Sequence, residues 1–112
     1  MIKEAVVETV QEIEYAIKHG ADRVELCDNL SVGGTTPSIG MIEIATEMCK
    51  ANNVEIAVMI RPRGGNFVYS FYDFEIMQRD ITAIKRCGID YFVFGCLTDD
   101  DTLNEWQMKT LK

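Results

Sequence analysis

Residues 55–95 read EIAVMIRPRGGNFVYSFYDFEIMQRDITAIKRCGIDYFVFG, and this stretch decides the fold of the chain. It begins with an apolar strand at 55–60 and ends with another at 91–95. Between the two, apolar side chains recur at helical spacing, at Phe74, Met77, Ile81 and Ile84. Ser70 and Asp73 form the signature that caps the start of a helix. Strand, helix and strand in this order predict two parallel strands joined by a right-handed crossover.

The same alternation fills the rest of the chain. Strands are predicted at 2–8 and 23–27, and a helix is predicted after each of them, from Val10 and from Thr36. A fourth helix is predicted at 101–112. The chain is therefore predicted to be an α/β protein with a parallel sheet and about four βα units.

A weak internal echo supports this repeating organisation. Residues 16–22 resemble residues 83–90 with one residue inserted, and both segments lie where a helix turns into the next strand. The sequence has no linker between these units, so residues 1–112 are predicted to form a single domain.

Composition and charge exclude several classes of function. Hydrophobic residues make up 47% and charged residues 26% of the chain, as in ordinary globular proteins. The net charge of −7 argues against nucleic acid and anionic membranes as partners, because both repel an acidic surface. The sequence also lacks an apolar run long enough to span a membrane.

The four cysteines are scattered and form no C-x-x-C pair; they are Cys27, Cys49, Cys87 and Cys96. The N-terminus has no signal-peptide pattern. We therefore expect reduced thiols in a cytoplasmic protein rather than a disulfide framework.

Three segments together resemble the copper homeostasis protein CutC family. They are GADRVELC at 20–27, GGTTPS at 33–38 and MIRPRGG at 59–65, of which the third is the most specific. The resemblance covers nearly the whole chain. The sequence differs from the family at Val6, where the first strand often carries a cysteine, and at Asn66, where an aspartate is usual.

The resemblance implies a parallel (βα)8 barrel of the TIM type. Such a barrel typically needs ~250 residues, so this chain would supply about its N-terminal half. The first and fourth strands would then expose unpaired edges. We expect a homo-oligomer, or pairing with the missing half-barrel. The family also implies a role in copper handling in the cytoplasm.

Barrels of this type carry their chemistry at the carboxyl ends of the strands, which we call the rim. For Cu(I), the candidate rim ligands are Cys27 and Cys96, with Met59 as a softer neighbour, because thiolate and thioether sulfur suit this ion. The alternative is that these cysteines only fill the core, where cysteine is common.

A small anion is the other candidate ligand at the rim. Arg61 and Arg63 offer guanidinium groups that bind a carboxylate or phosphate through paired hydrogen bonds. Gly64 and Gly65 let the backbone approach such a ligand closely. The alternative is that both arginines pair with acidic loop residues and hold the rim in shape.

Charged residues within the predicted strands leave two alternatives open. Arg23, Glu25 and Cys27 share one strand face, and buried ions are expensive unless they are paired. Arg23 and Glu25 could form an internal ion-pair layer with Glu8. They could instead line a pocket, with Arg23 binding the anion and Glu8 or Glu25 acting as acid or base. The second alternative predicts a barrel enzyme acting on a small anionic substrate.

Overall fold

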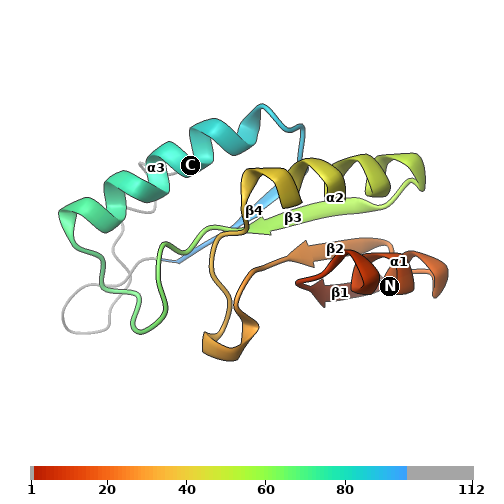
Figure 1. The fold of residues 1–112 in the computed structure, drawn as a ribbon, viewed down its shortest axis with the longest axis horizontal. Helices are drawn as coiled ribbons and strands as arrows, with labels where there is room; N and C mark the ends of the chain where they lie inside the picture. The colour runs from red at the N-terminus through yellow and green to blue at the C-terminus, as the bar shows by residue number, and fades with distance from the viewer. Residues whose placement is uncertain (1, 96–112) are drawn as a thin grey trace.

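A computed structural model describes residues 2–95, and these form one four-stranded parallel sheet (Figure 1). The strands follow one another across the sheet in chain order: β1 (Glu4–Val7), β2 (Arg23–Leu26), β3 (Glu55–Met59) and β4 (Tyr91–Val93). Each adjacent pair is parallel. The parallel sheet predicted from the strand and helix alternation is confirmed.

Helices connect the strands and cover one face of the sheet. They are α1 (Val10–Lys18), α2 (Ile39–Ala51) and α3 (Phe71–Lys85), with a short 3-10 turn, η1 (Leu30–Val32), after β2. Their buried faces join one apolar core with the sheet. The helix predicted at 101–112 lies outside the described residues.

Local side-chain caps explain where the helices begin. Ser70 and Asp73 form the predicted capping box at the start of α3. The start of α2 was predicted at Thr36 and is wrong by three residues, because Ser38 caps this helix by accepting a hydrogen bond from the backbone N–H of Met41 at 3.1 Å. The Thr36 hydroxyl bonds instead to the backbone of Arg61.

Alternation along the strands separates a core face from an open face. Val24 and Leu26 of β2, with Ile56 and Val58 of β3, are fully buried beneath the helices. The intervening residues point to the other face, which no described helix covers, and Val6 is 51% exposed there. The sheet therefore has one side buried in the usual manner and one side open.

The two outer strands differ from the inner ones in having a free edge. Among the described residues β1 pairs only with β2, and β4 pairs only with β3.

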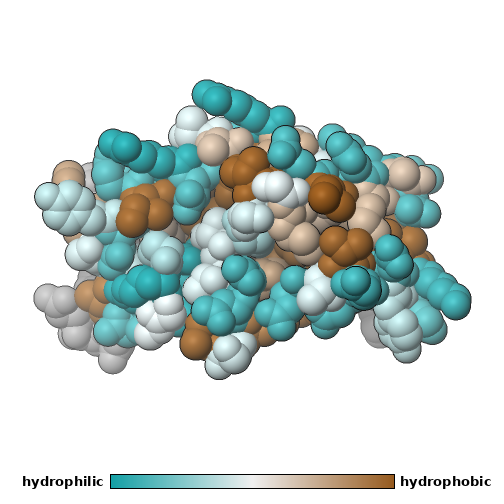
Figure 2. All heavy atoms as spheres, viewed as in Figure 1, coloured by the Kyte–Doolittle hydropathy of each residue, from teal (hydrophilic) through white to brown (hydrophobic). Residues whose placement is uncertain are grey.

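Hydrophobic and hydrophilic side chains are interspersed on the face shown in Figure 2. None of the described helices is both long and apolar enough to cross a membrane.

Candidate functional site at the carboxyl ends of the strands

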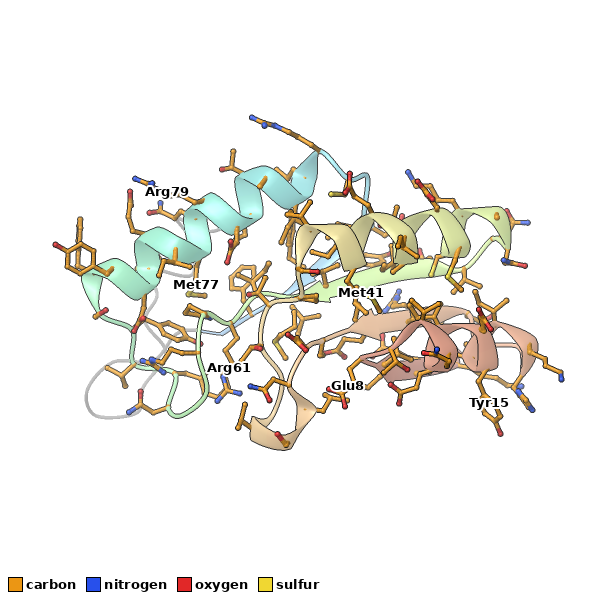
Figure 3. The ribbon with its side chains drawn as sticks, viewed as in Figure 1. Glu8, Tyr15, Met41, Arg61, Met77 and Arg79 are labelled. Carbon is orange, nitrogen blue, oxygen red and sulfur yellow. The ribbon has the colours of Figure 1, made fainter. Side chains whose placement is uncertain are left out.

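Two loops form the described part of the rim. The loop at 27–38 follows β2 and contains η1, and the loop at 60–70 follows β3. Both extend from the ends to which the strand arrows point in Figure 1. Glu8 and Arg61 lie on this side of the molecule in Figure 3.

Arg61 ties the two loops together. Its side chain is buried, with 5% of the residue exposed. Nη1 donates to the carbonyl oxygens of Val32 at 2.8 Å and Gly34 at 3.0 Å, and Nη2 donates to that of Gly65 at 2.5 Å. The Phe67 ring lies 4.8 Å from the guanidinium carbon. Nε is buried and has no acceptor among the described residues.

Arg63 is held within its own loop. Nε and Nη2 lie 3.2 and 3.1 Å from Oδ2 of Asp73, the residue that also caps α3. The remaining donors point to backbone carbonyl oxygens of Gly64, Asn66 and Val68. These contacts match the alternative in which an arginine braces the rim. The anion-binding role of Arg61 and Arg63 stays a prediction.

Sulfur-bearing side chains from two strands meet beneath the first loop. A Cβ built at Gly34 would lie 3.4 Å from Cβ and 3.5 Å from Sγ of Cys27, and 3.4 Å from Cε of Met59. The φ of +95° at Gly34 is one that glycine adopts readily. Cys27 and Met59 therefore reach the same point of the rim, from the ends of β2 and β3.

The Cys27 thiol is protonated at neutral pH. Burial raises its pKa to about 11, with further contributions from the charges of Glu25 and Glu8. The thiol makes a long contact, 3.9 Å, with Oε1 of Glu25. A metal ion bound here would have to displace the proton, since the thiolate is the form that ligates.

Glu25 and Glu4 lie together on the open face of the sheet. Burial raises the pKa of Glu25, and the neighbouring Glu4 carboxylate raises it further. A carboxyl group that holds its proton to higher pH is suited to acid–base chemistry. The acid or base role predicted for Glu8 and Glu25 stays a prediction.

Arg23 lies at the opposite end of β2 from the rim. It forms ion pairs with Glu4 at 3.4 Å and with Glu55 at 3.0 Å, and its guanidinium carbon lies 4.4 Å from the centre of the Tyr91 ring. Tyr91 Oη donates to Glu55 Oε2 at 3.0 Å. The predicted ion-pair layer of Arg23 and Glu25 with Glu8 does not form; the acidic partners of Arg23 are instead Glu4 and Glu55. Glu8 is elsewhere, accepting a hydrogen bond from the backbone of the loop after β2.

The sequence held a signal for the ion pairs of Arg23 with Glu4 and Glu55 that was missed. Glu4, Arg23 and Glu55 are each the first residue of a strand, and parallel pairing places them side by side. Adjacent parallel strands that begin with acid, base and acid therefore predict an ion-pair layer.

The remaining cysteines fall into two groups. Cys49 on α2 is fully buried in the core, and Cys87 is half-buried. Cys96 lies outside the described residues. Within residues 2–95, no three His, Cys, Asp or Glu side chains form a group that could hold a metal ion. A metal site at the rim would therefore have to use thioether sulfur or further ligands.

Comparisons with known proteins agree with this architecture. The family model described as the CutC family matches residues 1–112. A CutC family protein of Enterococcus faecalis is 50% identical over 105 residues, covering 94% of this chain and 50% of the relative. A human protein named copper homeostasis protein cutC homolog is 42% identical over 104 residues, covering 93% of this chain and 37% of the relative.

A solved structure is also similar over nearly the whole chain. CutC from Streptococcus agalactiae superimposes with a TM-score of 0.94 at 40% sequence identity, covering 99% of this chain and 53% of that one. The chain thus spans about half the length, or less, of these relatives, which is consistent with part of a TIM-type barrel. On the family match and these identities, the chain belongs to the CutC family.

Proposed function

We propose that this chain is the N-terminal half of a CutC-type barrel that serves copper homeostasis in the cytoplasm. In this proposal Cu(I) binds at the rim through Cys27 and Met59, with Cys96 as a further thiol ligand. The observation that carries it is the meeting of Cys27 and Met59 at Gly34. The names of relatives that refer to copper homeostasis support the same proposal.

The chemistry of the site suits a soft ion. Thiolate and thioether sulfur prefer Cu(I) over harder cations. Binding has to remove the Cys27 proton, and Glu25 lies beside the thiol as a group that could take it. Because burial and Glu4 raise the pKa of Glu25, this carboxylate is a better proton acceptor than an ordinary glutamate.

Anaerobic titration with Cu(I) against a competing chelator tests the proposal. Cys27→Ser should weaken binding by on the order of 100-fold, in line with the loss of a principal ligand. Cys49→Ser is the matched control, because Cys49 is also a buried thiol with its pKa raised to about 11, but lies on α2. Equal affinities of the wild-type and Cys27→Ser chains would reject Cys27 as a ligand. Cys96→Ser tests the further ligand in the same way.

A second candidate function is an enzyme that acts on a small carboxylate or phosphate substrate. The raised pKa of Glu25 on the open face favours it, since a general acid or base works best with a pKa near the working pH. Glu8 is the other proposed acid or base. Arg61, Arg63 and the backbone at Gly64 and Gly65 would anchor the anion.

Calorimetric titration of the chain with inorganic phosphate and with acetate tests this candidate. Most donors of both arginines already have acceptors in the loops, so binding is expected to involve the buried Nε of Arg61. Arg61→Lys keeps the charge but loses Nε, and should abolish anion binding. Unchanged binding in this variant, or none in the wild-type chain, would reject Arg61 as the anchor.

A further inference from the structure

An exposed aromatic ring lies beside the buried arginine of the loop after β3. The guanidinium carbon of Arg61 lies over one face of the Phe67 ring, 4.8 Å from its centre. The Tyr69 ring meets the Phe67 ring at 80°, with ring centres 6.4 Å apart. Tyr69 belongs to the apolar core, whereas Phe67 is 37% exposed. The exposed part of Phe67 therefore lies away from the guanidinium, where a second ring could stack on it.

The Phe67 ring is held in place through Arg61, which is itself held by both rim loops. The Arg61 side chain donates to the carbonyl oxygens of Val32 and Gly34 in one loop and of Gly65 in the other. A guanidinium is attracted to the π electrons of the ring that it covers. The ring is thus presented at the rim in one orientation. A ring that is already held loses little conformational freedom when a ligand stacks on it.

Free backbone donors lie next to this ring. The backbone N–H groups of Gly64, Gly65, Asn66 and Phe67 form no hydrogen bond with any other described residue. The φ of Gly65 is +95°, whereas the φ of Gly64 is not positive, so the chain turns sharply here. Consecutive N–H groups in such a turn form a concave site for an anion. Four consecutive residues therefore offer both an anion site and an aromatic surface.

We propose that Phe67 selects the ligand of the rim, and that this ligand is an aromatic ring carrying a phosphate or carboxylate group. The anionic group binds the N–H groups of residues 64–67, and the aromatic ring stacks on Phe67. The guanidinium behind Phe67 draws π-electron density away from the exposed side of the ring. This side therefore favours an electron-rich aromatic ring over a cation or the C–H face of a sugar. The inference rests on the second candidate function, the barrel enzyme, and names its substrate class.

Calorimetric titration with inorganic phosphate, phenyl phosphate and glucose 6-phosphate tests the inference. Phenyl phosphate should bind the wild-type chain about tenfold more tightly than inorganic phosphate, as expected for one stacked ring. Glucose 6-phosphate should gain less than about threefold over inorganic phosphate.

Two substitutions of Phe67 separate stacking from a merely structural role. Phe67→Leu keeps an apolar side chain over Arg61 but has no ring. It should bring the dissociation constants of inorganic phosphate and phenyl phosphate within about twofold of each other. Phe67→Tyr keeps the ring and should retain the preference for phenyl phosphate.

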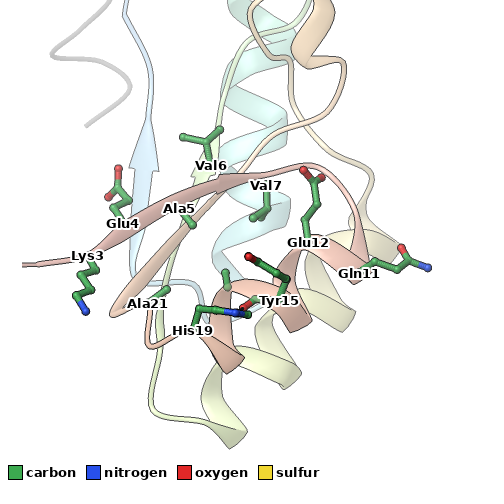
Figure 4. A pocket seen from close by; sticks show the side chains of 11 residues that line it. Lys3, Glu4, Ala5, Val6, Val7, Gln11, Glu12, Tyr15, His19 and Ala21 are labelled. Atoms are coloured by element: carbon green, nitrogen blue, oxygen red, sulfur yellow. Dashed lines mark hydrogen bonds between the residues drawn. The ribbon is translucent and has the colours of Figure 1, made fainter.

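Tyr15→Leu is the matched control. Tyr15 is also an exposed aromatic residue, but it stacks on His19 and borders the groove of about 500 Å³ between α1 and the edge of β1, away from the rim loops (Figure 4). This variant should leave the affinities for all three probes unchanged. Circular dichroism verifies that each variant is folded.

The possible failures are distinguishable. Equal affinities of the wild-type chain for inorganic phosphate and phenyl phosphate would overturn the inference and leave the second candidate function standing. A preference for phenyl phosphate that persists in Phe67→Leu would overturn it as well, since the ring would then bind elsewhere. A larger gain for glucose 6-phosphate than for phenyl phosphate would contradict the aromatic class. Binding of none of the three probes would reject the second candidate function and the inference together.

Discussion

The protonation state of Cys27 governs what this residue can bind. Its thiol is almost completely buried, and burial with the charges of Glu25 and Glu8 raises its pKa to about 11. Such a thiol is inert toward most reagents at neutral pH, since the thiolate is the reactive form. A metal ion that binds it must compete with the proton over the whole physiological range.

Cu(I) affinity should therefore rise with pH. Between pH 7 and 9 the ion displaces the Cys27 proton, which passes by way of Glu25 to solvent, so the apparent association constant should increase at least about tenfold per pH unit, and more steeply where Cys96 also ligates. Chelator competition at three pH values measures the slope. Cys49→Ser should show the same slope as wild type, and an affinity independent of pH would contradict a protonated Cys27 ligand.

Backbone conformation constrains Gly33 more tightly than an ordinary loop glycine. Gly33 has a φ of +92°, and an added Cβ would lie 3.0 Å from Nη1 of Arg61. Gly20 has a φ of +83° with nothing within 4 Å, so it isolates the backbone contribution. Gly20→Ala should lower the free energy of unfolding by about 1 kcal/mol.

Gly33→Ala should lower the free energy of unfolding by about 2–3 kcal/mol, because the new methyl group also displaces the guanidinium of Arg61, which joins the two loops. Urea denaturation of both variants measures the difference. Equal destabilisation by Gly20→Ala and Gly33→Ala would show that the close approach of Gly33 to Arg61 does not affect the free energy of unfolding.

At the level of elements, the relative position of the two rim loops depends on the side chain of Arg61, which contacts both of them. Arg61 donates to carbonyl oxygens of both loops, and its backbone N–H and C=O bond to the hydroxyl of Thr36. Few other described contacts join these loops, so their relative position depends on this residue.

Arg61→Met should destabilise the chain by about 3 kcal/mol, since it leaves three carbonyl oxygens without their charged donor. Arg79→Met is the control, because the Arg79 side chain is 82% exposed and its pair with Glu75 at 3.8 Å is a surface contact. Thermal and urea unfolding compare the two. A loss below about 1 kcal/mol for Arg61→Met would contradict the bracing role.

The sequence predicted the elements better than the contacts between them. Apolar periodicity and the Ser70 cap were enough to place α3, because both signals are local. The start of α2 was misplaced because Thr36 and Ser38 are both plausible caps, and the choice depends on Arg61, which is distant in sequence. The partners of Arg23 were not predicted, because only the register of the parallel strands brings the distant Glu4 beside it.

For the whole molecule, two buried thiols should make the free energy of unfolding decrease at alkaline pH. Burial raises the pKa values of Cys27 and Cys49 from 9.0 to about 11. Between these values the folded chain holds more protons than the unfolded chain, so the free energy of unfolding falls as pH rises. The stabilisation is complete below pH 9 and is lost as pH passes about 11.

We expect the decrease in the free energy of unfolding at alkaline pH to reach up to about 2 kcal/mol per thiol. Urea denaturation at several pH values from 8 to 11 measures it. The Cys27→Ser/Cys49→Ala double variant should show a shallower decline than wild type, whatever its stability at pH 8. Parallel curves for the two would contradict the assignment to these thiols.

The parallel sheet also explains how distant residues come to share one site. Parallel strands end at the same edge, so Cys27 and Met59 meet although 32 positions separate them in the sequence. X-ray absorption at the copper edge, on the Cu(I)-loaded chain labelled with selenomethionine, tests this convergence most directly. We predict copper–sulfur and copper–selenium scattering in the wild-type chain, with the selenium contribution absent in Met59→Leu and the sulfur contribution reduced in Cys27→Ser. Only nitrogen or oxygen neighbours around copper, or a selenium contribution that persists in Met59→Leu, would contradict it.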